Sequence, residues 1–282
     1  MALDLRGRVD RVAERVPPLA YALRVIDRYN DIHGNVNANS ITLTAFLALF
    51  AVTLLAVALI GFLDTTNVDV AKEITNALGL SGDAAKVITN AVNTARKSAR
   101  FASVVGFIGV VTVGTSFTNA VATAYNVCWE VKGRGLIDRA RGLVWLAGIG
   151  VCFIAGVVLT DWWTSLPGWL APLLAVVTVA INAVAWAFTS WWLPHRRIRL
   201  RAMLPAVLVG AVALEVLKVA AGFWVPRLIN KSSELWGAIG VVFAIIAWIL
   251  VFGRVVVYVA VIEVLEAERL GHKSPPGTNL LP

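Results

Sequence analysis

The chain has 282 residues, of which 59% are hydrophobic and only 15% are charged, and its mean hydropathy is +0.77. Soluble domains carry about 25% charged residues, so a soluble fold of this length is excluded because it could not cover so much apolar surface. The net charge of +8 would suggest nucleic acid in a soluble protein. Here the charges lie between apolar stretches, so we expect no nucleic-acid partner and predict an all-α polytopic membrane protein.

Six apolar stretches are long enough to cross a bilayer as helices, which takes roughly 20 residues each. In chain order they are 41–63, 102–127, 142–160, 169–192, 203–225 and 236–264. We therefore divide the chain into a cytoplasmic N-terminal segment 1–40, a six-helix transmembrane domain 41–264 and a cytoplasmic tail 265–282. No cleavable signal peptide is expected, since the first forty residues hold no apolar core of the required length.

Two segments outside the spans have helical periodicity. Apolar residues recur at helical spacing from Leu5 to Val16, Pro17 and Pro18 then break the pattern, and a second helix is predicted from Tyr21 onward. These helices either lie on the inner membrane surface or pack on cytoplasmic loops. Segment 64–101 predicts two further short amphipathic helices on the outer side, which either cap the bundle or form a plain surface hairpin.

Basic residues predict the orientation of the chain. Of the 25 Lys and Arg residues, 16 lie in the N-terminal segment, the 128–141 and 193–202 loops and the tail, whereas 7 lie in the alternate segments. Lys and Arg mark cytoplasmic loops, so both termini are expected in the cytosol. We therefore place the protein in a bacterial inner (plasma) membrane, where its basic face would contact anionic lipids.

The strongest functional signal is a pair of ionisable residues inside a span, because a charge at bilayer depth is costly and rare. Glu215 and Lys218 lie in the fifth span, three residues apart on one helix face, with Glu215 near the middle of the membrane. They either line a cavity that meets a charged headgroup or a proton, or pair with each other while Lys218 snorkels outward. Arg254 is expected near the inner headgroups, where it snorkels or binds an anionic lipid, and Glu263 at the cytosolic boundary.

Polar side chains recur along two other spans. The second span carries a stripe of hydroxyl and amide side chains that includes Thr115 and Asn119, and in the fourth span Thr178 and Asn182 share one face. If Asn119, Asn182 and Glu215 converge, the bundle has a polar interior suited to binding or translocating a substrate. Otherwise each residue has a local structural role, supporting close packing and hydrogen bonds between helices.

No motif for catalysis, cofactor binding or metal binding is found. Cys128 and Cys152 form no disulfide framework, and the three histidines form no ligand-spaced cluster. The GxxxxGK(S/T) loop, the HExxH motif and the GxSxG elbow are all missing. We therefore predict that the protein is not an enzyme and that it holds no cofactor and no metal.

Three stretches of the sequence carry a family resemblance. They are the Asn-rich segment 35–40, the segment SFTNAVATAYNV at 116–127 before a basic loop, and the stretch from LPHRR at 193–197 through Glu215 and Lys218 to 236–237. Together they resemble the YihY/BrkB family of bacterial inner-membrane proteins, and within it the YhjD-type branch. The family often ends its last span with Gly-Ala-Glu, of which Val261-Ile262-Glu263 keeps only the acid. The first span lacks the Tyr-Tyr and Pro residues common in the family.

The resemblance implies six transmembrane helices with cytosolic termini, and an association of YhjD-type members with export of envelope lipids and of others with serum resistance. We expect transport or export of a lipid or another amphiphilic envelope component. The alternative is a non-transporting membrane partner or scaffold of an envelope complex. The family was once labelled ribonuclease BN-like, but no residue pattern here supports a nuclease. The residues specify neither a substrate nor an oligomeric state.

Overall fold

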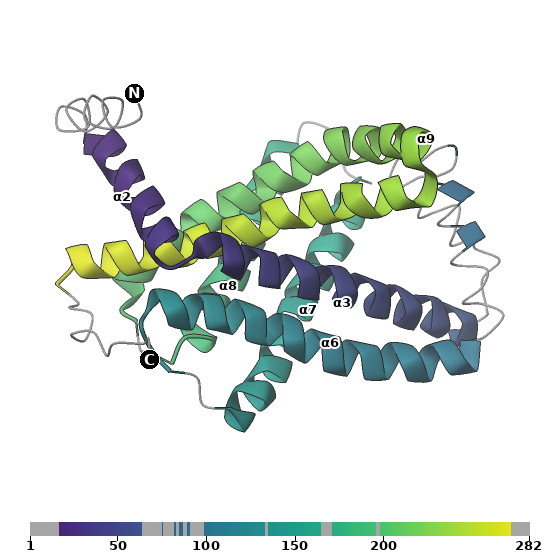
Figure 1. The fold of residues 1–282 in the computed structure, drawn as a ribbon, viewed down its shortest axis with the longest axis horizontal. Coiled ribbons are helices and arrows are strands. Elements are labelled where there is room, and N and C mark those ends of the chain that lie inside the picture. The colour runs from purple at the N-terminus through teal and green to yellow at the C-terminus, as the bar shows by residue number, and fades with distance from the viewer. Residues whose placement is uncertain are drawn as a thin grey trace.

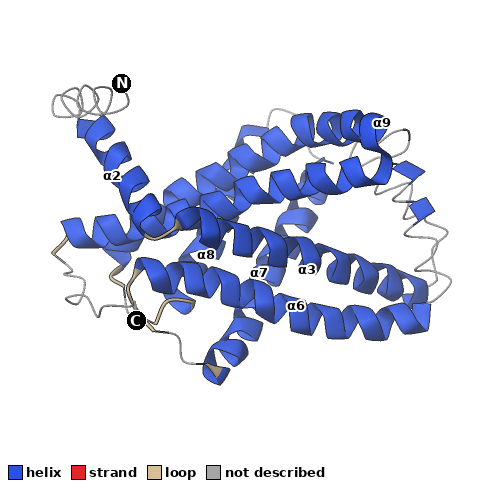
Figure 2. Ribbon diagram, viewed as in Figure 1, coloured by secondary structure: helices blue, strands red, loops and turns tan. Residues whose placement is uncertain are grey.

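The computed structural model of the protein describes residues 17–63, 75, 82, 85–86, 89–90, 99–132, 135–164, 171–195 and 198–271. Its helices are α2 Pro17–Asp31, α3 Gly34–Leu63, α6 Ala99–Cys128, α7 Leu136–Thr164, α8 Ala171–Trp192 and α9 Leu200–Arg269. Figure 2 shows only helices and loops in this part of the chain. The all-α prediction is confirmed.

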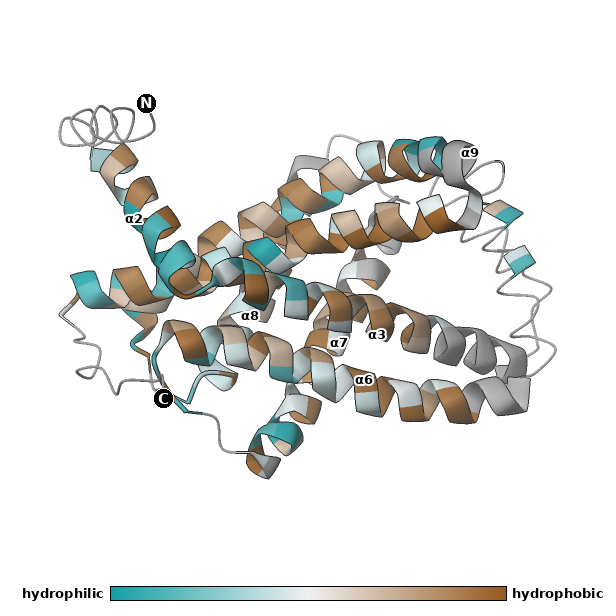
Figure 3. Cartoon of the chain, viewed as in Figure 1, coloured by the Kyte–Doolittle hydropathy of each residue, from teal (hydrophilic) through white to brown (hydrophobic). Residues whose placement is uncertain are grey.

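Five helical segments among the described residues are long and apolar enough to cross a membrane, namely Gly34–Thr53, Val104–Cys128, Ile137–Gly156, Leu200–Lys231 and Ile239–Arg269. A shorter apolar helix, Val176–Trp192, coincides with the fourth predicted span. Apolar residues colour the middle of these helices in Figure 3, and hydrophilic ones gather on α2 and at helix ends. Phe107, Phe153 and Phe223 are each more than 60% exposed, as expected for side chains that face lipid.

The fifth and sixth predicted spans form the two halves of α9, which reverses direction at Gly237 (Figure 1). Gly237 has φ 58° and ψ −138°, and a positive φ is far less costly for glycine than for other residues. The segment 226–235, predicted as the connection between these spans, is helical instead. Hydropathy shows where a chain leaves the hydrocarbon of the membrane, but it does not show where the helix ends. A helix forms its own backbone hydrogen bonds, so it can continue into water.

The remaining helices build a bundle around this hairpin. Antiparallel α3 and α6 run side by side, and α3 also packs on α9 (Figure 1). α2 meets the last turn of α9, where the Arg269 guanidinium lies 5.7 Å from the centre of the Tyr21 ring. Both described ends of the chain therefore lie at one end of the bundle, which we call the terminal end.

α2 packs on the protein through one face. Val25 and Tyr29 are buried, and the Tyr29 ring stacks on Tyr258 of α9 with centroids 4.3 Å apart. Arg28 pairs with Glu130 beyond α6 at 3.0 Å. The sequence left open which surface the helix from Tyr21 onward contacts. In the structure, this helix docks on α9 and on the end of α6. The predicted first amphipathic helix and almost all of the predicted 64–101 hairpin lie outside the described residues.

The main buried core lies toward the terminal end. Its largest fully buried side chains include Tyr125, Trp129, Ile41 and Glu263. A smaller group toward the other end, Ile229, Val241 and Ala244, packs the two halves of α9 together. Packing is therefore densest where α2, α3, α6, α8 and α9 meet.

Glycines in α6 allow close contact with its neighbours. A Cβ atom at Gly114 would lie 2.6 Å from Leu146 of α7, and one at Gly109 would lie 3.0 Å from Ala51 of α3. Such distances leave no room for a side chain without movement of the neighbour. The close-packing interpretation of this span is confirmed for these two residues.

Candidate functional site

Glu215 is the centre of a polar cluster between α8 and α9. Its Oε2 atom lies 2.7 Å from Lys218 Nζ and accepts a hydrogen bond of 2.9 Å from Asn182 Nδ2. Its Oε1 atom accepts a 3.2 Å bond from Thr178 Oγ1. Glu215 and Lys218 are paired, which was one of the two alternatives for these residues, and Thr178 and Asn182 of the fourth predicted span join them.

The cluster is anchored on one side and open on the other. The α8 partners Thr178 and Asn182 are buried, whereas the side chains of Glu215 and Lys218 are 24% and 49% exposed. Two donors from α8 fix the carboxylate, so the ammonium group is the part of the cluster left accessible. Hydrogen bonds to a charged group contribute more than those between neutral groups.

The exposed neighbours of the cluster on α9 are apolar. Val216, Val219 and Phe223 on this stretch are each more than half exposed. Lys218 follows Leu200 by 18 residues, or about 27 Å of helix, within the apolar segment Leu200–Lys231. A cation is thus presented at membrane depth among lipid-facing side chains, although charged residues in spans almost always face the protein interior or a water-filled cavity.

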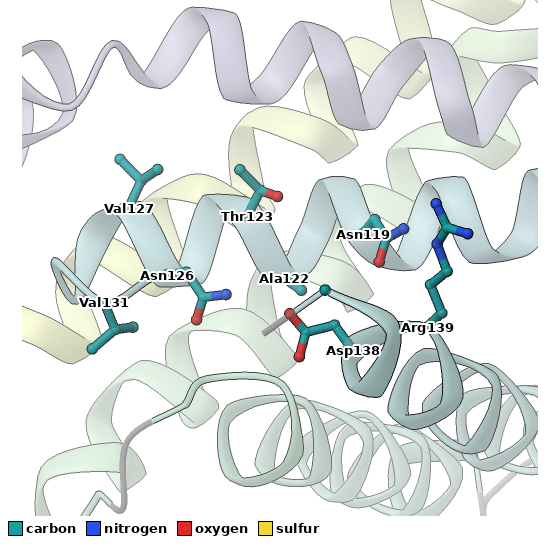
Figure 4. Close-up of a pocket in the computed structure, with 9 residues that line it drawn as sticks. Asn119, Ala122, Thr123, Asn126, Val127, Val131, Asp138 and Arg139 are labelled. Carbon is teal, nitrogen blue, oxygen red and sulfur yellow. The ribbon is translucent and has the colours of Figure 1, made fainter. Parts of the chain in front are cut away.

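A second polar feature is a pocket of about 460 Å³ at the terminal end, between α6 and the start of α7. It is lined by Asn119, Ala122, Thr123, Asn126, Val127, Val131, Gly135, Asp138 and Arg139. Figure 4 shows Asp138 and Arg139 projecting from the first turn of α7 beside Asn119 and Asn126 of α6. Of the residues expected to converge, Asn182 therefore meets Glu215, whereas Asn119 belongs to this separate pocket.

His195 fixes two of the groups around the pocket. Its Nε2 atom lies 2.6 Å from Asp138 Oδ1, and its Nδ1 atom lies 3.3 Å from Asn126 Oδ1. The His195 side chain is only 4% exposed, so the loop after α8 is held against α6 and α7. Sequence reasoning missed this network because its members are 57 and 69 residues apart, and no local pattern connects them.

Two other predicted site residues lie away from Glu215. Thr115 Oγ1 donates to the backbone carbonyls of Val111 and Thr112, both at 2.8 Å, within its own helix, as hydroxyl side chains in helices often do. Arg254 is exposed on the second half of α9 and lies within electrostatic range of Tyr29 in α2. The structure thus places Arg254 toward the terminal end.

Glu263 was expected to face the cytosolic boundary, and its side chain is buried instead. The exposure of the side chain is 0%. The helical register explains this burial, since Val256, Val259 and Ala260 precede it at spacings of seven, four and three residues and are all buried. Counting along the buried face would have found this site, whereas distance from the membrane edge did not.

Comparison with known proteins identifies the family. Residues 25–279 match the family described as virulence factor BrkB. The chain belongs to the BrkB family. This confirms the YihY/BrkB resemblance drawn from segments 35–40, 116–127 and 193–237, and the match covers all six apolar helices.

Relatives within and around this family are distant in sequence. Inner membrane protein YhjD of Escherichia coli K12 is 23% identical over 308 aligned positions, covering 98% of this chain and 90% of the relative. An uncharacterized protein of Dickeya dadantii is 24% identical, covering 87% and 82%. A UPF0761 membrane protein of Ralstonia nicotianae is 23% identical, covering 60% and 41%. No solved structure matches. With its apolar helices, this BrkB-family chain is an integral, multi-pass inner-membrane protein.

Proposed function

We propose that this BrkB-family protein moves a lipid or another amphiphile with a charged headgroup across the inner membrane. The observation that carries the proposal is the Glu215–Lys218 pair, half-open on an apolar helix surface at membrane depth. A charged headgroup crossing hydrocarbon meets a large electrostatic barrier. A fixed ion pair part-way across lowers that barrier because it replaces some of the lost hydration.

The two charges of the cluster have different tasks in this proposal. Glu215 is held by Asn182 and Thr178, so its carboxylate is fixed and positions the Lys218 side chain. Lys218 is the more exposed partner, and its ammonium group is the one that meets an anionic headgroup. The acyl chains remain in the bilayer beside the exposed apolar side chains of α9.

Transfer of a fluorescent anionic phospholipid between the leaflets of reconstituted vesicles tests this function. We expect the wild-type protein to accelerate transfer over protein-free vesicles, and Lys218→Ala and Glu215→Gln to lower the rate on the order of tenfold, about 1.4 kcal/mol of barrier. Lys231→Ala, which removes an exposed cation from the far part of the same half-helix, is the matched control and should retain transfer.

Unchanged transfer in both cluster variants would remove Glu215 and Lys218 from the mechanism. Absence of transfer by the wild-type protein, with one stoichiometric envelope protein recovered when the membrane is extracted, would instead favour the partner or scaffold role. Retention of folded protein is checked for each variant by size-exclusion chromatography.

We further propose that the terminal end of the bundle faces the cytosol. α2 and the end of α9 lie together, and this end also carries the basic loops 128–141 and 193–202. A fluorescent protein fused after residue 282 should therefore fluoresce, and alkaline phosphatase at the same position should be inactive. The same reporters inserted between α7 and α8 should behave in the opposite way. The reverse pattern at the two positions would overturn this orientation.

A further inference from the structure

A second acid, apart from the Glu215 cluster, lies in the main core. Glu263 on the second half of α9 has 0% exposure and is among the largest fully buried side chains of the described residues. Neither of its carboxyl oxygens has a hydrogen-bond partner. Polar groups buried to this degree are nearly always bonded, so this carboxyl group requires an explanation.

The groups around Glu263 are polar but neutral. Ser190 of α8 and Trp129, just beyond α6, lie near the carboxyl group. Tyr125 of α6 lies within electrostatic range, and its hydroxyl group and that of Ser190 are themselves buried without a bonded partner. Two segments from different parts of the chain, the end of α6 and α8, therefore bring hydroxyl and indole groups to a single acid.

No cation accompanies this acid among the described residues. The side chains that act on the carboxyl group of Glu263 are Ser190 and Trp129. Tyr125 and Cys128 are the titratable groups of α6 that feel its charge, and Arg28 of α2 acts on Cys128. A buried carboxylate without a cation is strongly disfavoured relative to its neutral form. Neutral donors that form no hydrogen bond with the carboxylate do not compensate its negative charge, whereas a bound proton neutralises it.

We propose that Glu263 is a proton-binding site. It holds its proton in the packing seen here and releases it to water only when α6, α8 and α9 separate. Release leaves a carboxylate that Ser190, Trp129 and Tyr125 can reach as donors, so the two protonation states favour different arrangements of these three segments. Coupling of this proton to lipid transfer rests on the proposed function, whereas the proton site itself does not.

Infrared spectroscopy of the purified full-length protein at neutral pH tests the site without any transport measurement. Exposed carboxyl groups are ionised at this pH, so the carbonyl band of a protonated carboxyl group reports a buried acid. We expect this band in the wild-type protein, its loss in Glu263→Gln and its retention in Glu215→Gln, because Glu215 is paired with Lys218. Absence of the band in the wild-type protein, or its survival in Glu263→Gln, overturns the proposal.

Two further measurements complete the test. The first applies if Glu263→Gln does not fold, and the second tests the release of the proton. Ser190→Ala keeps the acid and removes a facing hydroxyl group, so the band should shift in frequency, and an unshifted band counts against the site. In heavy water, exchange of the carboxyl proton for deuterium shifts the frequency of the carbonyl band. This shift should be slower for Glu263 than for surface carboxyl groups that are protonated at acid pH. Immediate exchange would show that no separation of helices is needed.

Discussion

Gly253→Ala is expected to lower the free energy of unfolding by about 1–3 kcal/mol, the usual cost of overpacking a tight contact. A Cβ atom at Gly253 would lie 2.7 Å from the backbone oxygen of Ala38 and 2.9 Å from Thr42 Oγ1. That carbonyl already accepts a bond of 2.7 Å from Thr42. Because the obstacle is backbone of α3, it cannot be relieved by a side-chain rotation, and α3 and α9 must move apart.

Gly222→Ala in the same helix is the matched control for this substitution. Gly222 is exposed, and a Cβ atom added there would meet nothing within 4 Å, so alanine should leave stability unchanged or raise it by up to ~1 kcal/mol through helix propensity. Unfolding of both variants in mixed detergent micelles, followed by circular dichroism, gives the comparison. Equal stability of the two variants would contradict the tight α3–α9 contact.

Removal of only one charge from the Glu215–Lys218 pair should destabilise the protein more than removal of both. Lys218→Met leaves Glu215 at membrane depth without its cation, and we expect a loss of roughly 2–3 kcal/mol. This is below the ~3–5 kcal/mol typical of a fully buried pair, since Glu215 is 24% exposed and keeps Asn182 and Thr178 as donors.

The double variant Glu215→Gln, Lys218→Met should recover most of that stability, because a neutral amide can keep bonds to α8 without an unpaired charge. Lys231→Met controls for loss of an exposed lysine from the same half-helix. The unfolding experiment used for Gly253 compares the wild-type protein with Glu215→Gln, Lys218→Met, the double variant and Lys231→Met. Additive losses, with the double variant the least stable, would show that the two charges do not depend on each other.

Stability and transport together separate two roles for the pair. If the double variant is stable but inactive in lipid transfer, the charges act on the substrate. A stable and active double variant would make them an element of packing. Neither measurement alone makes this distinction, since an unpaired charge disturbs both folding and function.

Local rules predicted the pair within one helix but not its setting. The three-residue spacing of Glu215 and Lys218 placed them on one helix face and made their pairing one of two alternatives. The two donors on α8 lie 33 and 37 residues before Glu215, so their arrival depends on how α8 packs on α9. Asn119 has the same side chain as Asn182, and it lies at a similar distance from the end of its helix. It is nevertheless on the face of α6 that lines the pocket beside α7.

The sequence by itself determined the all-α class and the six apolar helices, because lipid solvation requires long apolar segments that bond their own backbone. It also determined the family, through the order of short segments along the chain. The tertiary structure decided which polar residues meet, since contacts between helices depend on the register and rotation of each one. It placed Glu263 in the core, joined His195 to Asp138 and separated Asn119 from Glu215. Hydropathy is calculated along one helix, whereas a site is formed by contacts between several helices. Hydropathy therefore predicts the helices and does not predict which of their polar residues meet.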